Sequence, residues 1–82
     1  MYHFIERLGR EIIITRNDST VIITKAIFHS DDLIDLISEE EILEGDLITT
    51  LDTDHTYRVV FVTQIFDEHG KIDHIRLGIE HT

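Results

Sequence analysis

The chain has 82 residues, no cysteine, and a formal net charge of −10 from 17 acidic and 7 basic residues. This length predicts a single domain over residues 1–82, and the missing cysteines exclude a disulfide framework, a Cys-based zinc site and a thiol nucleophile. The negative charge disfavours binding to nucleic acid or to an anionic membrane, because both need a basic footprint. No apolar run reaches the ~18 residues of a membrane span, and residues 1–7 do not resemble a signal peptide, so a cytoplasmic protein is expected.

Residues 2–9 have two interpretations. Phe4, Ile5 and Leu8 share one face of a helical turn, or the same residues form an irregular entry segment that Gly9 ends. Both alternatives stay open at this stage.

The following part of the chain is typical of a β-hairpin. Residues 11–16 are a short β-branched run, apolar on both faces, which predicts a buried strand. Residues 17–20 are a cluster of turn formers, and residues 21–29 return to β-branched character. Two such runs around a short polar turn predict a hairpin.

Residues 30–46 carry helix start signals, although the apolar period is poor. The serine and aspartates at 30–32 are suited to cap a short helix over 33–37. Ser38 followed by Glu41 fits a capping box, and Gly45 is a natural stop. We therefore expect one or two short helical turns, with an extended segment through 33–37 as the alternative.

The second half of the chain predicts three strands separated by polar turns. Residues 47–51 and 57–66 are strands around the turn 52–56, and residues 67–71 form a turn before the last strand. In the long strand, one face is expected to carry Tyr57, Val59, Phe61 and Ile65, and the other Val60, Val62 and Phe66. If Phe61 is a core residue, Phe61→Ala removes about 3–5 kcal/mol of stability.

The last strand alternates cleanly. The inward face is expected to carry Ile75, Leu77 and Ile79, and the outward face His74, Arg76 and Glu80. Gly78 on the outward face indicates a bulge or a close backbone approach. The whole pattern predicts a mainly β fold, a small antiparallel β-barrel or sandwich of about five strands with a short helical insertion. Closure is favoured because it removes exposed strand edges.

No motif in the sequence indicates catalysis or a bound cofactor. The six histidines raise the question of a metal site, and Asp52, Asp54 and His55 share one turn, but their spacing fails the calcium-loop pattern. No Gly-x-Ser-x-Gly elbow or phosphate-binding loop is present, and the acidic run 39–41 lacks the sheltered setting that acid–base catalysis needs. We predict a protein that is not an enzyme, with a small His/Asp metal-binding protein as one alternative.

The acidic residues are unevenly distributed. Ten of the 17 lie between Asp31 and Asp54, a stretch without Lys or Arg. The simplest interpretation is that they keep a small β domain soluble. As an interaction surface, the candidate partner-binding residues are Asp31, Asp32, Asp35, Glu39, Glu40, Glu41, Glu44, Val60 and Val62. One alternative function is an acidic decoy that binds the basic groove of a nucleic-acid-binding protein.

Residues 44–48, 52–59 and 72–75 resemble small bacteriophage or prophage head–tail connector proteins, the head-completion or stopper components, over about residues 44–79. The shared features are a Gly-Asp before a strand (Gly45-Asp46), a polar hairpin, and a Tyr-Arg-Val strand beginning at Tyr57. The resemblance implies a compact β-barrel and a non-enzymatic virion protein that docks in a ring. It carries over no functional residue, because the matching positions are architectural. A chain this small is also expected to gain stability by forming a homo-oligomer or by joining a larger assembly.

Overall fold

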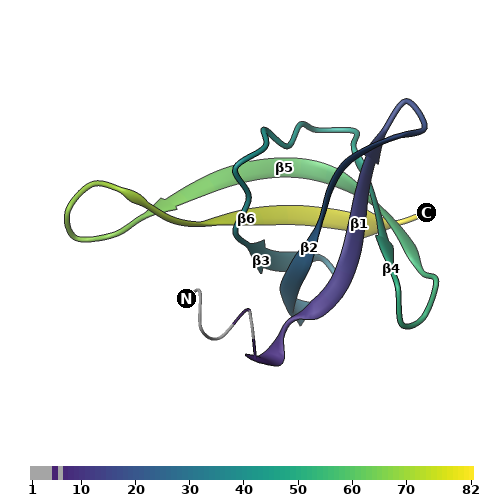
Figure 1. Cartoon of the computed structure of the whole chain (residues 1–82), viewed down its shortest axis with the longest axis horizontal. Coiled ribbons are helices and arrows are strands. Elements are labelled where there is room, and N and C mark those ends of the chain that lie inside the picture. The colour runs from purple at the N-terminus through teal and green to yellow at the C-terminus, as the bar shows by residue number, and fades with distance from the viewer. Residues whose placement is uncertain (1–4, 6) are drawn as a thin grey trace.

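The computed structural model describes residue 5 and residues 7–82, which form a closed antiparallel barrel of six strands (Figure 1). The strands are β1 (Arg10–Arg16), β2 (Ser19–Ser30), β3 (Leu33–Leu36), β4 (Leu47–Thr50), β5 (Thr56–Phe66) and β6 (Ile72–His81). The predicted mainly β barrel is confirmed, with six strands instead of about five. Within the described residues, no helix has the length and apolarity needed to cross a membrane.

Two three-stranded meanders, β1-β2-β3 and β4-β5-β6, build the barrel. They meet at two antiparallel seams, where β1 pairs with β4 and β3 pairs with β6. Ile14 lies opposite Ile48 in the first seam, and Asp35 lies opposite Arg76 in the second. Because each seam joins residues far apart in the sequence, no tight turn fixes its register, and the side chains must do so.

Two Arg–Asp pairs lie at the ends of the β1–β4 seam. Nε and Nη2 of Arg16 donate to the two carboxylate oxygens of Asp46, both at 2.8 Å. At the other end, Nε and Nη2 of Arg10 donate to Asp52 at 3.0 and 3.1 Å. Both pairs continue the register that places Ile12 opposite Thr50. Their two-pronged geometry matches one alignment of the strands and therefore favours it.

The core lies inside the barrel, where alternate positions of every strand point inward. Its buried residues are Ile12, Ile14, Ala26, Ile34, Leu36, Ile42, Ile48, Tyr57, Val59, Ile75, Leu77 and Ile79. The predicted inward positions Tyr57 and Val59 in β5, and all three in β6, are therefore confirmed.

The predicted helical insertion is wrong, and the extended alternative for residues 33–37 is right, because β3 occupies Leu33–Leu36. Ser38 explains the error at 38–45. Its hydroxyl accepts from the N–H of Glu40 at 3.0 Å and donates to the Glu40 carbonyl at 2.8 Å. A helix cap would use the N–H two or three residues into a helix, whereas the same side chain here stabilises a local turn. Gly45 has φ of 92°, a left-handed value that ends this loop instead of a helix.

The N-terminal question is settled only in part. The N–H of Gly9 donates to the carbonyl of Ile5 at 2.9 Å, which is the bond of one helical turn. Ile5 is buried and Leu8 is exposed. Phe4, the third residue of the predicted face, lies outside the described residues.

A β-bulge in β5 reverses the predicted faces of that strand. Val59 pairs with Ile79 and Phe61 pairs with Gly78, which leaves Val60 as an extra residue. Beyond the bulge Val62 packs against the core, while Phe61 is 41% exposed. The prediction that Phe61 is a core residue is therefore wrong, because one inserted residue exchanges the two faces of a strand.

The ring of Phe61 covers Gly78 on the outer face of the barrel. A Cβ atom built on Gly78 would lie 2.0 Å from Cε2 of Phe61, so only glycine leaves room for the ring. The predicted close approach at Gly78 is confirmed. An aromatic side chain over a strand glycine replaces the packing that the glycine itself lacks.

We expect Phe61→Ala to reduce the free energy of unfolding by only about 1 kcal/mol, because the ring is half-exposed. Gly78→Ala should destabilise the wild type by displacing the ring. In the Phe61→Ala background it should be neutral or stabilising, because alanine loses less backbone entropy than glycine. Urea unfolding of the four proteins should give a coupling energy of about 1 kcal/mol. If Gly78→Ala changes the free energy of unfolding equally in the wild type and in Phe61→Ala, the contact between the Phe61 ring and Gly78 is contradicted.

Candidate functional site

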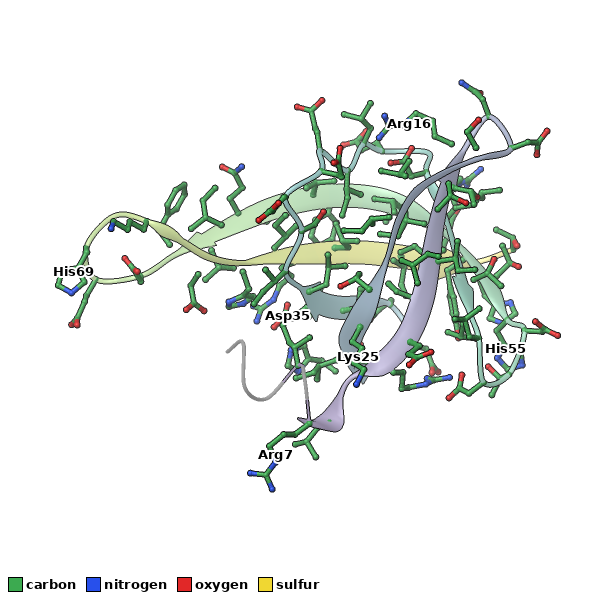
Figure 2. The ribbon with its side chains drawn as sticks, in the orientation of Figure 1. Arg7, Arg16, Lys25, Asp35, His55 and His69 are labelled. Atoms are coloured by element: carbon green, nitrogen blue, oxygen red, sulfur yellow. The ribbon has the colours of Figure 1, made fainter. Side chains whose placement is uncertain are left out.

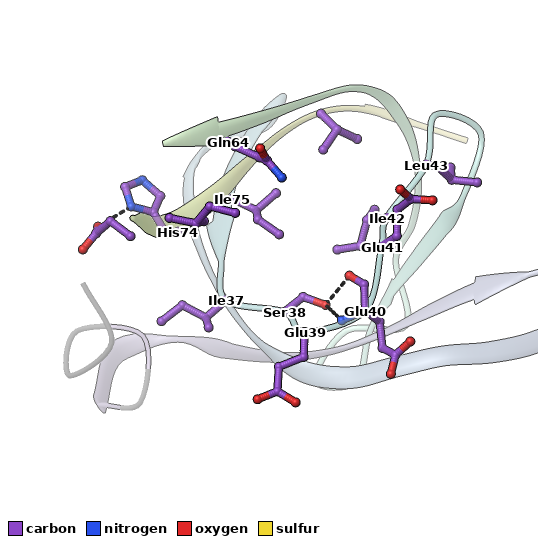
Figure 3. A pocket seen from close by; sticks show the side chains of 13 residues that line it. Ile37, Ser38, Glu39, Glu40, Glu41, Ile42, Leu43, Gln64, His74 and Ile75 are labelled. Carbon is purple, nitrogen blue, oxygen red and sulfur yellow. Dashed lines mark hydrogen bonds and ion pairs between the residues drawn. The ribbon is translucent and has the colours of Figure 1, made fainter. Parts of the chain in front are cut away.

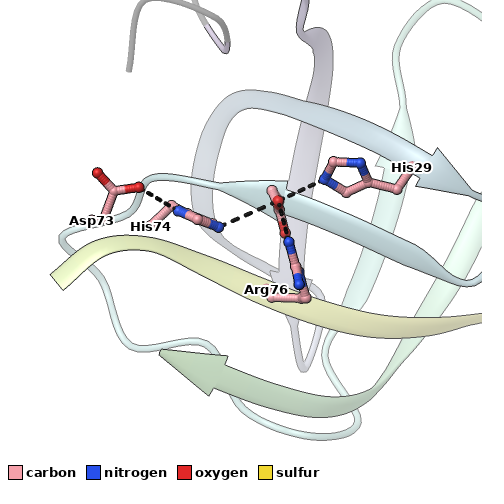
Figure 4. A network of polar contacts seen from close by, with 5 residues as sticks. His29, Asp73, His74 and Arg76 are labelled. Atoms are coloured by element: carbon pink, nitrogen blue, oxygen red, sulfur yellow. Dashed lines mark hydrogen bonds and ion pairs between the residues drawn. The ribbon is translucent and has the colours of Figure 1, made fainter. Parts of the chain in front are cut away.

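A cluster of polar residues lies on the outer face of β2, β3 and β6 and centres on Asp35 (Figure 4). Asp35 is fully buried. Its carboxylate accepts from Nε and Nη2 of Arg76 at 2.8 and 3.0 Å, and from Nε2 of His29 at 2.6 Å. Asp35 alternates with Ile34 and Leu36, which enter the core, so its own side chain must lie on the opposite face.

His74 extends the cluster along β6. Its side chain is only 7% exposed, with Nδ1 2.6 Å from Oδ2 of Asp73. Nε2 lies 3.3 Å from Oδ2 of Asp35 but outside hydrogen-bond geometry. The prediction that His74 lies on the outward face of β6 is correct, although its side chain is buried there.

The charges around Asp35 hold it ionised. Burial raises the pKa of the Asp35 carboxyl, but the hydrogen bonds from Arg76 and His29 and the nearby His74 together lower it below its ordinary value. The hydrogen bonds that Arg76 donates to Asp35 raise the pKa of Arg76 in turn. Because both Asp35 oxygens already accept hydrogen bonds, a metal ion here would have to displace Arg76. Among the described residues, no group of three His, Asp or Glu side chains is arranged to hold a metal ion.

A groove of about 600 Å³ opens beside this cluster (Figure 3). The loop 37–43 forms one wall, and residues of β5 and β6, including Gln64, His74 and Ile75, form the other. Its lining combines apolar side chains with acidic ones, namely Ile37, Ile42, Leu43, Val62, Ile72 and Ile75 with Glu39, Glu40, Glu41 and Asp73.

Asp46 holds the loop wall in place. The N–H of Leu43 donates to its Oδ2 at 2.9 Å, and Arg16 also donates to the Glu41 carbonyl at 3.0 Å. The backbone of the loop bonds to β5 through Gly45 N–H to Val59 O and Val59 N–H to Asp46 O, both at 2.8 Å. The hydrogen bond from Arg16 lowers the pKa of Asp46, against the effect of burial, so the anchor stays charged. The groove is therefore formed before any ligand arrives.

The predicted partner-binding residues separate into three groups. Glu39, Glu40, Glu41 and Val62 line the groove. Asp31, Asp32, Glu44 and Val60 are exposed outside it. Asp35 is buried in the polar cluster and presents no carboxylate to a partner.

The β5–β6 hairpin extends beyond the barrel as an arm, defined here as residues 65–74 (Figure 1). In the described structure, β4 pairs with β5 only over Thr56–Arg58, and β3 pairs with β6 only over residues 75–78, so the arm strands pair with each other alone. Phe66 and Ile72 form a cross-strand pair in the arm and are 56% and 52% exposed.

The turn of the arm is well ordered by one side chain. Oδ1 of Asp67 accepts from the N–H groups of His69 and Lys71 at 2.8 and 3.0 Å. Gly70 supplies the positive φ of 79° that the turn requires. The exposed side chains around this turn are visible in Figure 2, where His69 marks the tip.

Comparisons with protein-family models, curated proteins and solved structures found no match to this chain.

We expect Asp35→Asn to reduce the free energy of unfolding at neutral pH by about 2 kcal/mol, because it removes charge-assisted hydrogen bonds from Arg76 and His29. The folded-state pKa of Asp35 is lowered, so its contribution is present above the pKa of the unfolded carboxyl and is lost as pH falls through the folded value. The variant should therefore lose less stability than the wild type from about pH 5 to pH 2. Urea unfolding across this range measures how the free energy of unfolding changes with pH in the wild type and in the variant. Asp31→Asn, a change at an exposed residue, is the control. An equal pH dependence of the free energy of unfolding in Asp35→Asn and in the wild type would contradict a lowered pKa for Asp35.

Proposed function

We propose that the chain is a non-enzymatic structural module that assembles with further copies of itself through the β5–β6 arm. The observation that carries this proposal is the exposed Phe66–Ile72 pair on a hairpin that lacks strand neighbours in the described structure. A two-stranded ribbon is marginally stable in water without a surface to pack on. Large apolar side chains that gather on such a ribbon indicate a contact with another molecule.

The construction of the arm supports an assembly role. Asp67 orders its turn through two backbone hydrogen bonds, so little entropy remains to be lost when the arm docks. The molecule is 36 Å long against 24 and 21 Å across, and its long axis follows the arm (Figure 1). An arm of this kind reaches a neighbouring subunit without moving the barrel.

The polar cluster supports a structural role over a catalytic one. A His–Asp dyad acts as a general base through the histidine nitrogen that its aspartate does not hold. In the Asp73–His74 pair that nitrogen is Nε2, and it faces Asp35. Asp35 itself is held by Arg76 and His29. We infer that these residues stabilise the β3–β6 seam.

The resemblance of residues 44–79 to phage head–tail connector proteins gives the proposed module a setting, the joining of head and tail in a virion. An arm on one copy that contacts a different surface of the next makes a heterologous interface, and such contacts close into rings when the rotation allows. Val60 and Phe61, 39% and 41% exposed, offer apolar surface for that contact.

The acidic-decoy alternative has less support from the geometry. A decoy needs its carboxylates free on one surface, but Asp35 and Asp46 are buried in ion pairs and Asp52 is bonded to Arg10. Asp31 and Asp32 lie at the β2–β3 turn, outside the groove lined by Glu39–Glu41. The acidic stretch therefore does not form one continuous patch.

We expect wild-type protein to sediment as an oligomer whose proportion rises with concentration, and Phe66→Ser to shift it to monomer. Serine at position 66 removes the most exposed apolar side chain of the arm without entering the core. The matched control is Ile23→Ser, because Ile23 on β2 is 64% exposed and lies outside the arm. Sedimentation velocity over a wide concentration range makes the measurement, and thermal melting confirms that both variants fold. A wild type that stays monomeric throughout, or equal dissociation by both variants, would contradict the proposal.

A further inference from the structure

We propose that the groove between the loop 37–43 and the β5–β6 hairpin binds an extended, basic segment of a partner protein that also carries apolar side chains. This is a second interaction surface, and it does not depend on self-assembly through the arm. Four kinds of observation carry it: the shape of the groove, its apolar lining, its charge and the free edge of β5.

The apolar lining gives the groove its capacity to bind. Ile42 and Ile75 are almost fully buried and form a firm base, whereas Leu43 and Ile72 are 43% and 52% exposed. Burial of the exposed part of these two side chains under a ligand stabilises the complex in proportion to the apolar area removed from water. The loop wall is anchored by Asp46, so the groove does not have to order itself on binding.

The charge of the groove selects the sign of the ligand. Glu39, Glu40 and Glu41 are exposed on the loop wall, and the ion pairs between described residues include none of the three. The described residues that line the groove include no Lys or Arg. Figure 3 shows the carboxylates of Glu39 and Glu40 on the outer side of the loop, directed away from Gln64 and Ile75 of the facing wall, so they lie at the rim of the groove. Lysine or arginine on the ligand relieves this accumulation of like charge.

The free edge of β5 favours an extended ligand. Beyond Val59, β5 has β6 as its only ladder partner within the described residues, and Val62 and Gln64 of this part line the groove. An extended peptide beside an open strand edge gains main-chain hydrogen bonds, while its alternate side chains enter the groove.

The arm of a second copy does not fit this groove. Its turn carries Asp67 and Glu68 against a single Lys71, so it brings negative charge to a negative wall. The chain supplies few basic residues of its own, since the described part contains Lys25, Lys71 and five arginines. Charge complementarity therefore indicates a different protein as the partner.

The test uses a fluorescently labelled peptide of alternating lysine and leucine as the probe, with anisotropy read at low and high salt. One comparison peptide replaces leucine with serine, and another replaces lysine with glutamate. The groove variant is Glu39→Lys/Glu40→Lys/Glu41→Lys. The matched control is Glu11→Lys/Asp31→Lys/Asp32→Lys, which makes the same change in net charge at exposed residues outside the groove and outside the arm.

We expect the lysine–leucine peptide to bind the wild type, with an affinity at least about tenfold lower for the groove variant. The control variant should lose less than about threefold, and both comparison peptides should bind much more weakly than the probe. Equal losses in the two variants would show attraction to overall charge and overturn the proposal. Equal binding of the lysine–serine peptide, or no binding at low salt, would overturn it as well. If the probe binds as expected but the protein never self-associates, the groove assignment stands and the arm assignment fails.

Discussion

Closure of this barrel depends on the alignment of two meanders that are distant in sequence, and bidentate Arg–Asp pairs fix that alignment. Arg76–Asp35 spans the β3–β6 seam, and Arg16–Asp46 lies at the end of the β1–β4 seam. A slip of one residue would point the Asp35 carboxylate into the core and its apolar neighbours into solvent. A buried carboxylate without its partner is strongly destabilising, so each pair penalises every register except the observed one. The value of these pairs therefore lies in specificity more than in net stability.

The same pairs explain why the groove is acidic. The chain has only 7 basic residues, and Arg10, Arg16, Arg58 and Arg76 all pair with acids on neighbouring strands or at strand ends. Few cations remain for the loop 37–43. Arg16 lies near Glu41 and donates to its carbonyl, whereas the ion pairs between described residues include neither Glu39 nor Glu40. Most arginines of this cation-poor chain are used in ion pairs that fix the register of the strands. The acidic residues of the loop therefore produce a local negative electrostatic potential. The charge of the proposed binding groove follows from this distribution of arginines.

Local sequence patterns predicted the strands well because alternation and turn residues report directly on a pleated, half-buried backbone. They were insufficient where a side chain can stabilise two different local structures, or where a residue distant in sequence determines the local structure. Ser38 is suited equally to a helix cap and to a short turn, and only the barrel context selects the turn. Phe61 changes face because of a bulge in β5; the local signal, Gly78, lies on the partner strand β6 and does not indicate which β5 residue is inserted. Asp35 was grouped with the acidic partner-binding residues. Its place between Ile34 and Leu36 indicates only the outer face of a strand, and its burial depends on Arg76 and His29 from neighbouring strands.

The arm and the groove share one piece of structure, the β5–β6 hairpin, so their contacts are linked physically. Ile72 lies in the arm, opposite Phe66, and also lines the groove. A basic segment that packs on Ile72 would cover part of the apolar surface on which the proposed self-assembly through the arm depends. Two ligands that require the same side chain weaken each other's binding by the same factor, whichever binds first. If both proposals hold, occupation of the groove opposes assembly through the arm, and release of the groove partner restores the surface that a neighbouring copy would use.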